Sequence, residues 1–119
     1  MANENTVLAH LRHWLDDSAA DSELLPLCLS GLDSIRARLR DKADDNDLRA
    51  ISAAAAIALY QYQLKQRISG GTPLNFKAGD MSIQSAGDPL DAAIQLRDYC
   101  LNDATVLFNN SDFVFLTCG

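Results

Sequence analysis

The chain has 119 residues, of which 48% are hydrophobic, and this composition is typical of one globular domain rather than of a disordered segment. Its 16 acidic and 10 basic side chains give a formal net charge of −6, which excludes a general attraction for nucleic acid. The basic side chains are concentrated in residues 36–77, between two acidic thirds. We interpret them as solvated helix faces, and a local basic patch is the alternative.

Three cysteines, Cys28, Cys100 and Cys118, occur without a CxxC or a zinc spacing. Their odd number and apolar surroundings indicate reduced thiols in a cytoplasmic setting. The first ten residues, MANENTVLAH, lack a basic segment and a long apolar run, so no secretory signal is predicted.

The first predicted helix runs from Thr6 to Leu15, and Asn5 or Thr6 is expected to cap it. Five apolar residues share one of its faces: Val7, Leu8, Leu11, Trp14 and Leu15. His10 and His13 are three residues apart and could share a metal ion. Since no nearby Cys or Glu completes a ligand set, we expect a surface or packing role.

A second helix is predicted from about Glu23 to Lys42, with Pro26 in its first turn. Apolar residues recur at spacings of three and four, at Leu25, Cys28, Leu32, Ile35 and Leu39. Gly31 either weakens the middle of this helix or lets a neighbour come close. The outer face carries Arg36, Arg38, Arg40 and Lys42.

The acidic turn ADDND, residues 43–47, invites a calcium-binding interpretation. An EF-hand loop needs Gly at its sixth position and Glu at its twelfth. Counting from Asp45, those positions hold Ala50 and Ala56, so the pattern fails. Cap and turn chemistry explains these residues better.

The chain is organised around the alanine-rich stretch from Leu48 to Ile68, which predicts a long helix. Asn46 or Asp47 can cap its start, and Gly70-Gly71 stops it. Because it is apolar on nearly every side, neighbouring helices must bury it, and its small side chains allow close approach. A membrane span is rejected, because polar residues interrupt its second half.

Residues 69–87, SGGTPLNFKAGDMSIQSAG, break the helical pattern and predict a long loop, in which Met81 to Gln84 form a short strand. Loops of this length are usually functional or disordered. The Gly-Gly pair is not a phosphate-binding loop, because no GxxxxGK[ST] motif follows it.

Asp88 as cap and Pro89 at the first position predict a last helix that runs to about Phe108. Its expected buried face consists of Leu90, Ala93, Ile94, Leu101, Ala104, Leu107 and Phe108. Residues 112–117 have the composition of an extended segment, which could pair with the loop strand or with another molecule. The aromatic residues Trp14, Tyr60, Tyr62 and Tyr99 are expected in the core.

The sequence therefore predicts one mainly α domain over residues 1–119: a small antiparallel bundle of about four helices, with a long Gly-rich loop and a short extended C-terminal segment. No cysteine has an evident catalytic partner, and no G-x-S-x-G motif occurs. We expect no enzymatic activity, no cofactor and no metal site.

The order of elements resembles a known family: a short helix, two longer antiparallel helices and an Ala-rich central helix ending in ALYQY, then the Gly-rich loop GGTPLNFKAGDMSIQ and a last helix. Over residues 6–116 the chain resembles the small head–tail connector, or head completion, proteins of long-tailed bacteriophages and prophages. The extended segment from Phe113 to Leu116 departs from a purely helical subunit.

This resemblance implies a structural virion protein, made in the bacterial host cytoplasm, that assembles as a ring, commonly a dodecamer, below the portal. It implies contacts with other copies, with the portal protein and with a neck or tail completion protein. DNA would pass through the channel without specific binding, and no membrane contact is expected.

The expected partner interface consists of Phe76, Lys77, Asp80, Met81, Phe113, Val114, Phe115 and Leu116. These residues come from the long loop and the extended tail, which would supply surface to neighbouring subunits. The alternative interpretation is a small cytoplasmic helical adaptor or regulatory module that binds one protein partner, and an enzyme subunit is a weaker third possibility.

Overall fold

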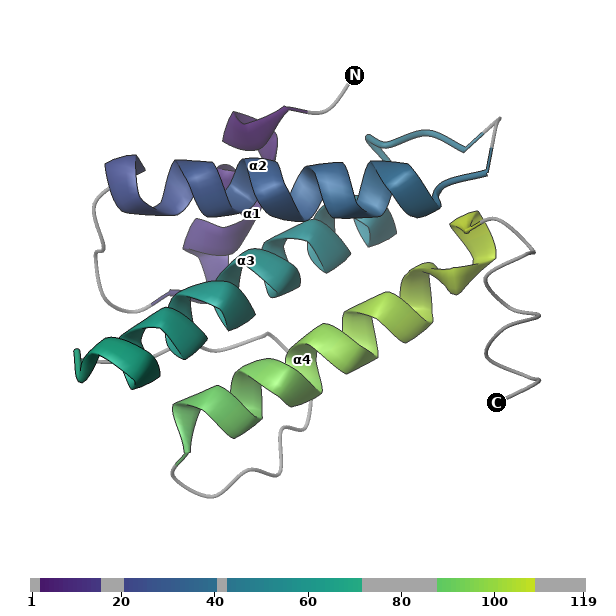
Figure 1. Ribbon diagram of the computed structural model, residues 1–119. Coiled ribbons are helices and arrows are strands. Elements are labelled where there is room, and N and C mark those ends of the chain that lie inside the picture. Colours follow the sequence, from purple (N-terminus) through teal and green to yellow (C-terminus); the bar gives the residue numbers. More distant parts are fainter. Residues whose placement is uncertain (1–2, 16–20, 41–42, 72–87, 109–119) are drawn as a thin grey trace.

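The computed structural model describes residues 3–15, 21–40, 43–71 and 88–108. These residues form the helices α1 (Glu4–Trp14), α2 (Asp21–Arg38), α3 (Leu48–Ser69) and α4 (Pro89–Ala104), followed by the short 3-10 helix η1 (Thr105–Leu107) (Figure 1). The prediction of a mainly α helical bundle is confirmed. The predicted loop strand and extended tail lie in residues 72–87 and 109–119, outside the described residues.

Helix α3 is the centre of the bundle and contacts α1, α2 and α4. In Figure 1 it lies between α2 and α4. Its alanines at positions 50, 53–56 and 58 are all fully buried, together with Leu59. A helix surrounded in this way needs small side chains, because each neighbour must approach its backbone closely.

Both ends of α3 follow the sequence prediction. The Asp47 carboxylate accepts a hydrogen bond of 2.9 Å from the backbone N–H of Arg49, and Gly70 ends the helix with a left-handed φ of 75°. The expectation that α3 is buried on nearly every side is wrong at its two ends, because Leu48 is 65% exposed and Ile68 is 78% exposed.

Helix α2 crosses α3 at Gly31, which has no room for a side chain. A Cβ atom at this position would overlap the carbonyl oxygen of Ala54. Of the two interpretations of Gly31, the close approach of a neighbouring helix is therefore the correct one.

The boundaries of α2 differ from the prediction at both ends. The helix begins at Asp21, whose carboxylate pairs with Arg12 of α1, so Pro26 lies inside it rather than in its first turn. It ends at Arg38, before the predicted Lys42. Leu39 instead forms an isolated antiparallel β-bridge with Phe108, a long-range pairing that draws the backbone out of the helix.

Helix α1 begins earlier than expected, because Asn3 is its cap. The Asn3 side chain accepts a hydrogen bond of 3.0 Å from the backbone N–H of Thr6, so the prediction of Asn5 or Thr6 as cap was wrong. Val7, Leu8, Leu11 and Trp14 are buried as predicted.

Helix α4 starts as predicted, with the Asp88 carboxylate accepting a hydrogen bond of 3.0 Å from Leu90 N–H and Pro89 in the first position. It packs on α3 through a stripe that consists of Ala93, Leu96, Cys100 and Ala104. The prediction missed Leu96 and Cys100. It also overestimated the burial of Leu90, Ile94 and Leu101, which are only partly buried.

Candidate interaction surface

The interface residues expected from the sequence all lie outside the described residues. They are Phe76, Lys77, Asp80, Met81, Phe113, Val114, Phe115 and Leu116. The candidate sites that the structure does place lie on the four helices and η1.

The two histidines of α1 have different surroundings. His10 Nε2 lies 3.0 Å from Ser52 Oγ of α3, and its ring meets Trp14 edge to face at 4.9 Å, whereas His13 is exposed. Desolvation by burial, and to a smaller degree the charge of His13, lower the pKa of His10 from its ordinary value. A neutral imidazole that bonds a hydroxyl ties α1 to α3, which is a packing role. Within the described ranges no three His, Cys, Asp or Glu residues form a possible metal site.

Cys28 of α2 and Cys100 of α4 are buried free thiols. Burial raises the pKa of Cys28 to about 12 and that of Cys100 to about 11. Both are therefore protonated at neutral pH, and a protonated, buried thiol is a poor nucleophile.

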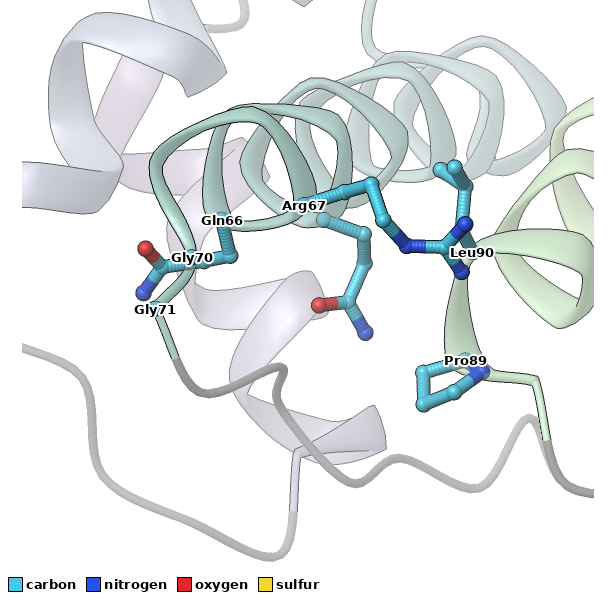
Figure 2. A pocket seen from close by; sticks show the side chains of 7 residues that line it. Gln66, Arg67, Gly70, Gly71, Pro89 and Leu90 are labelled. Carbon is cyan, nitrogen blue, oxygen red and sulfur yellow. The ribbon is translucent and has the colours of Figure 1, made fainter.

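A shallow depression of about 180 Å³ lies between the end of α3 and the start of α4 (Figure 2). It is lined by Gln63, Gln66, Arg67, Gly70, Gly71, Pro89 and Leu90. Arg67 is already engaged, since its guanidinium lies 2.6 Å from the carboxylate of Asp88, the cap of α4. The ion pair balances the charge at the rim, and the depression therefore offers amide groups and an apolar wall rather than a free charge.

A further feature is the outer side of α4 and of the adjoining η1, which we call the α4 patch. It is formed by the exposed residues Gln95, Asp98, Tyr99, Asn102, Asp103 and Val106. Tyr99, Asp103 and Val106 follow one another at helical spacings of four and three, so they lie along one line. Tyr99 is 58% exposed and Val106 is 53% exposed.

The expectation that Tyr99 belongs to the core was wrong. The sequence carried a signal for this, because Tyr99 falls off the stripe of Ala93, Leu96, Cys100 and Ala104 that faces α3. The other three aromatic residues that were expected in the core do contact it: Trp14 and Tyr62 are buried, and Tyr60 packs against the buried cluster.

Arg97 links the α4 patch to α3. Its guanidinium carbon lies 4.4 Å from the centre of the Tyr60 ring, and one of its nitrogens lies 3.0 Å from the carboxylate of Asp98. The position of Asp98 within the patch is thereby tied to the bundle.

A second exposed feature, the arginine edge, consists of Arg38 and Arg40 at the end of α2. The other described arginines, Arg12, Arg36, Arg49, Arg67 and Arg97, all take part in ion pairs. Arg38 and Arg40 have no ion pair within the described part of the chain. The backbone N–H of Arg40 donates to the carbonyl oxygen of Leu107 over 3.0 Å, so this edge adjoins the η1 end of the α4 patch.

None of the helices in the described ranges is both long enough and apolar enough to span a bilayer. Comparisons with protein-family models, with curated proteins and with solved structures each returned no match.

Proposed function

We propose that the chain is a structural subunit that acts by binding other protein subunits, as a head–tail connector of a long-tailed bacteriophage or prophage. The observation that carries this proposal is the α4 patch, where an exposed tyrosine and an exposed valine lie in line with carboxylate and amide side chains. Interfaces combine such apolar and aromatic centres with a polar surround.

The packing of the bundle supports a role as a rigid building block. Helix α3 is enclosed by three other helices, and α4 is held to it by a continuous buried stripe. A subunit of this kind presents its exposed face in a fixed orientation, which lowers the conformational cost of assembly.

In the connector role, copies of the chain form a ring below the portal that extends the DNA channel and receives a neck or tail completion protein. The net charge of −6 supports such a role, because DNA slides past acidic walls without being held. The protein would then reside in the virion after synthesis in the host cytoplasm.

Solution mass is the direct test of this proposal. The full chain should be analysed by sedimentation velocity from micromolar to near-millimolar concentration, with negative-stain electron microscopy of the largest species. We expect a closed ring of many subunits. A monomer at every concentration that forms a one-to-one complex with a single protein partner would favour the adaptor function and contradict the connector.

A further inference from the structure

We propose that two copies of this chain associate through a contact between the α4 patch of one copy and the arginine edge, Arg38 and Arg40, of the other. This inference deepens the proposed function and rests on the self-assembly that it requires. It names the two surfaces that meet and the chemistry that joins them.

The charges of the described surface make these two regions complementary. Arg38 and Arg40 carry two positive charges without an ion pair among the described residues, whereas the α4 patch presents the carboxylates of Asp98 and Asp103. Among the described residues, Asp98 forms an ion pair only with its neighbour Arg97, on the same helix. Opposite charges on two docking surfaces favour encounter and fix the register of the contact.

Tyr99 supplies the centre of the contact. Within the subunit, the guanidinium of Arg97 already lies over the ring of Tyr60 at 4.4 Å, so this chain uses arginine–tyrosine stacking once. The exposed ring of Tyr99 lies between Asp98 and Asp103 and offers the same chemistry to an arginine of a second copy. Val106 continues the apolar part of the surface toward η1.

Both surfaces are held in place before they meet. The buried side chains of Cys100 and Ala104 fix the back of the patch. The Leu39–Phe108 bridge fixes the backbone on which the arginine edge is carried. Little backbone ordering is therefore needed on association.

The same contact can build two kinds of closed assembly. Repeated in one direction around an axis it builds a ring, and returned reciprocally between two copies it builds a pair. The mass of the assembly in solution distinguishes the ring from the pair, because the two contain different numbers of subunits.

The test uses charge reversal on each side of the contact. The variants Arg38→Glu/Arg40→Glu and Asp98→Lys/Asp103→Lys should each weaken self-association by about tenfold or more, because like charges then face each other. An equimolar mixture of the two should associate again, since each remaining contact then joins opposite charges. Circular dichroism checks that every variant is folded.

Matched controls change a charge elsewhere on the bundle. Lys65→Glu alters an exposed base near the C-terminal end of α3. Glu4→Lys alters an acid at the start of α1, which packs on α2 and α3. Both should associate like the unaltered chain.

The outcomes separate the contact from the connector function. A ring that ignores both charge reversals overturns the contact and leaves the connector standing. A charge-dependent pair supports the contact and contradicts the ring. A chain that is monomeric at all concentrations overturns both.

Tyr99 provides a second, independent measurement. Tyr99→Ala should weaken association by about tenfold, in the range of central aromatic interface residues, whereas Tyr99→Phe keeps the aromatic face and should retain most of the affinity. Equal affinities of the alanine and phenylalanine variants would overturn the central role of this ring.

Discussion

Helices α3 and α4 are neighbours, but they use their side chains in opposite ways. In α3 almost every position from Ala50 to Leu59 is buried by three surrounding helices. In α4 one stripe faces α3, and the opposite side is exposed from Asp91 to Asp103. The comparison shows that the number of neighbours, rather than helix propensity, decides which residues are constrained by folding and which are available for binding.

The largest expected effect comes from placing a charge in the enclosed helix. Ile57 is 8% exposed, so Ile57→Asp buries an unpaired carboxylate, which costs several kcal/mol and removes most of the stability of a domain worth about 5–15 kcal/mol. Urea unfolding measures the loss. Leu48→Asp is the matched control, since Leu48 begins the same helix in solvent and an acid suits a helix start. A normally stable Ile57→Asp variant would place this face of α3 outside the core.

The next largest effect tests how closely α2 and α3 approach. Gly31→Ala adds a methyl group that overlaps the Ala54 carbonyl, so the helices must separate, at a cost of about 1–3 kcal/mol despite the better helix propensity of alanine. Thermal unfolding shows the difference against Ser30→Ala, an exposed position on the same helix. If Gly31→Ala were as stable as Ser30→Ala, the two helices would not be in close contact at this position.

A smaller effect concerns the start of α4. Asp88→Ala removes both the cap of the Leu90 N–H and the partner of Arg67, and should cost about 1 kcal/mol. Asp91→Ala removes an acid from the same turn that is not the cap, and should cost only a few tenths of a kcal/mol. Chemical denaturation of the two variants measures the difference, and equal losses would contradict the capping role of Asp88.

The last prediction concerns the pH dependence of the contact between α1 and α3. Because the folded state lowers the pKa of His10 below its ordinary value of 6.5, the unfolded chain binds more protons between the two values. The free energy of unfolding should therefore fall as the pH drops below about 6.5 and level off below the folded pKa. Denaturant unfolding at pH 8 and pH 5 measures the change.

The control for this pH dependence is a pair of histidine variants. His10→Gln should show a smaller loss of stability on acidification than the unaltered chain, whereas His13→Gln should keep most of that loss, because burial is the first cause of the shift. Equal losses in all three proteins would assign the pH dependence to other groups.

Local signals in the sequence predicted much of the bundle. Asp47 with Gly70, and Asp88 with Pro89, delimit α3 and the start of α4, since caps and breakers act within one turn. The end of α2 could not be found in this way. It depends on a backbone bridge between Leu39 and Phe108, residues that are far apart in the chain.

The candidate surface was less predictable than the fold. Helical spacing shows that Tyr99 and Val106 lie off the buried stripe of α4, but it does not show whether a further helix covers them. Likewise, the helical pattern places both Arg36 and Arg38 on the outer face of the second helix and does not distinguish them. Only the folded chain brings Arg36 within 2.9 Å of Asp45 and leaves Arg38 exposed.

The two buried thiols allow the opening of α2 and the opening of α4 to be measured separately. Cys28 lies on α2 and Cys100 on α4, and a reagent reaches either sulfur only when that helix opens. In a Cys118→Ser variant, the labelling rate of Cys28 therefore reports the opening of α2, and that of Cys100 reports the opening of α4. Faster labelling at Cys100 would mean that α4 detaches from α3 before the rest unfolds, and equal rates would mean that the bundle opens as one cooperative unit.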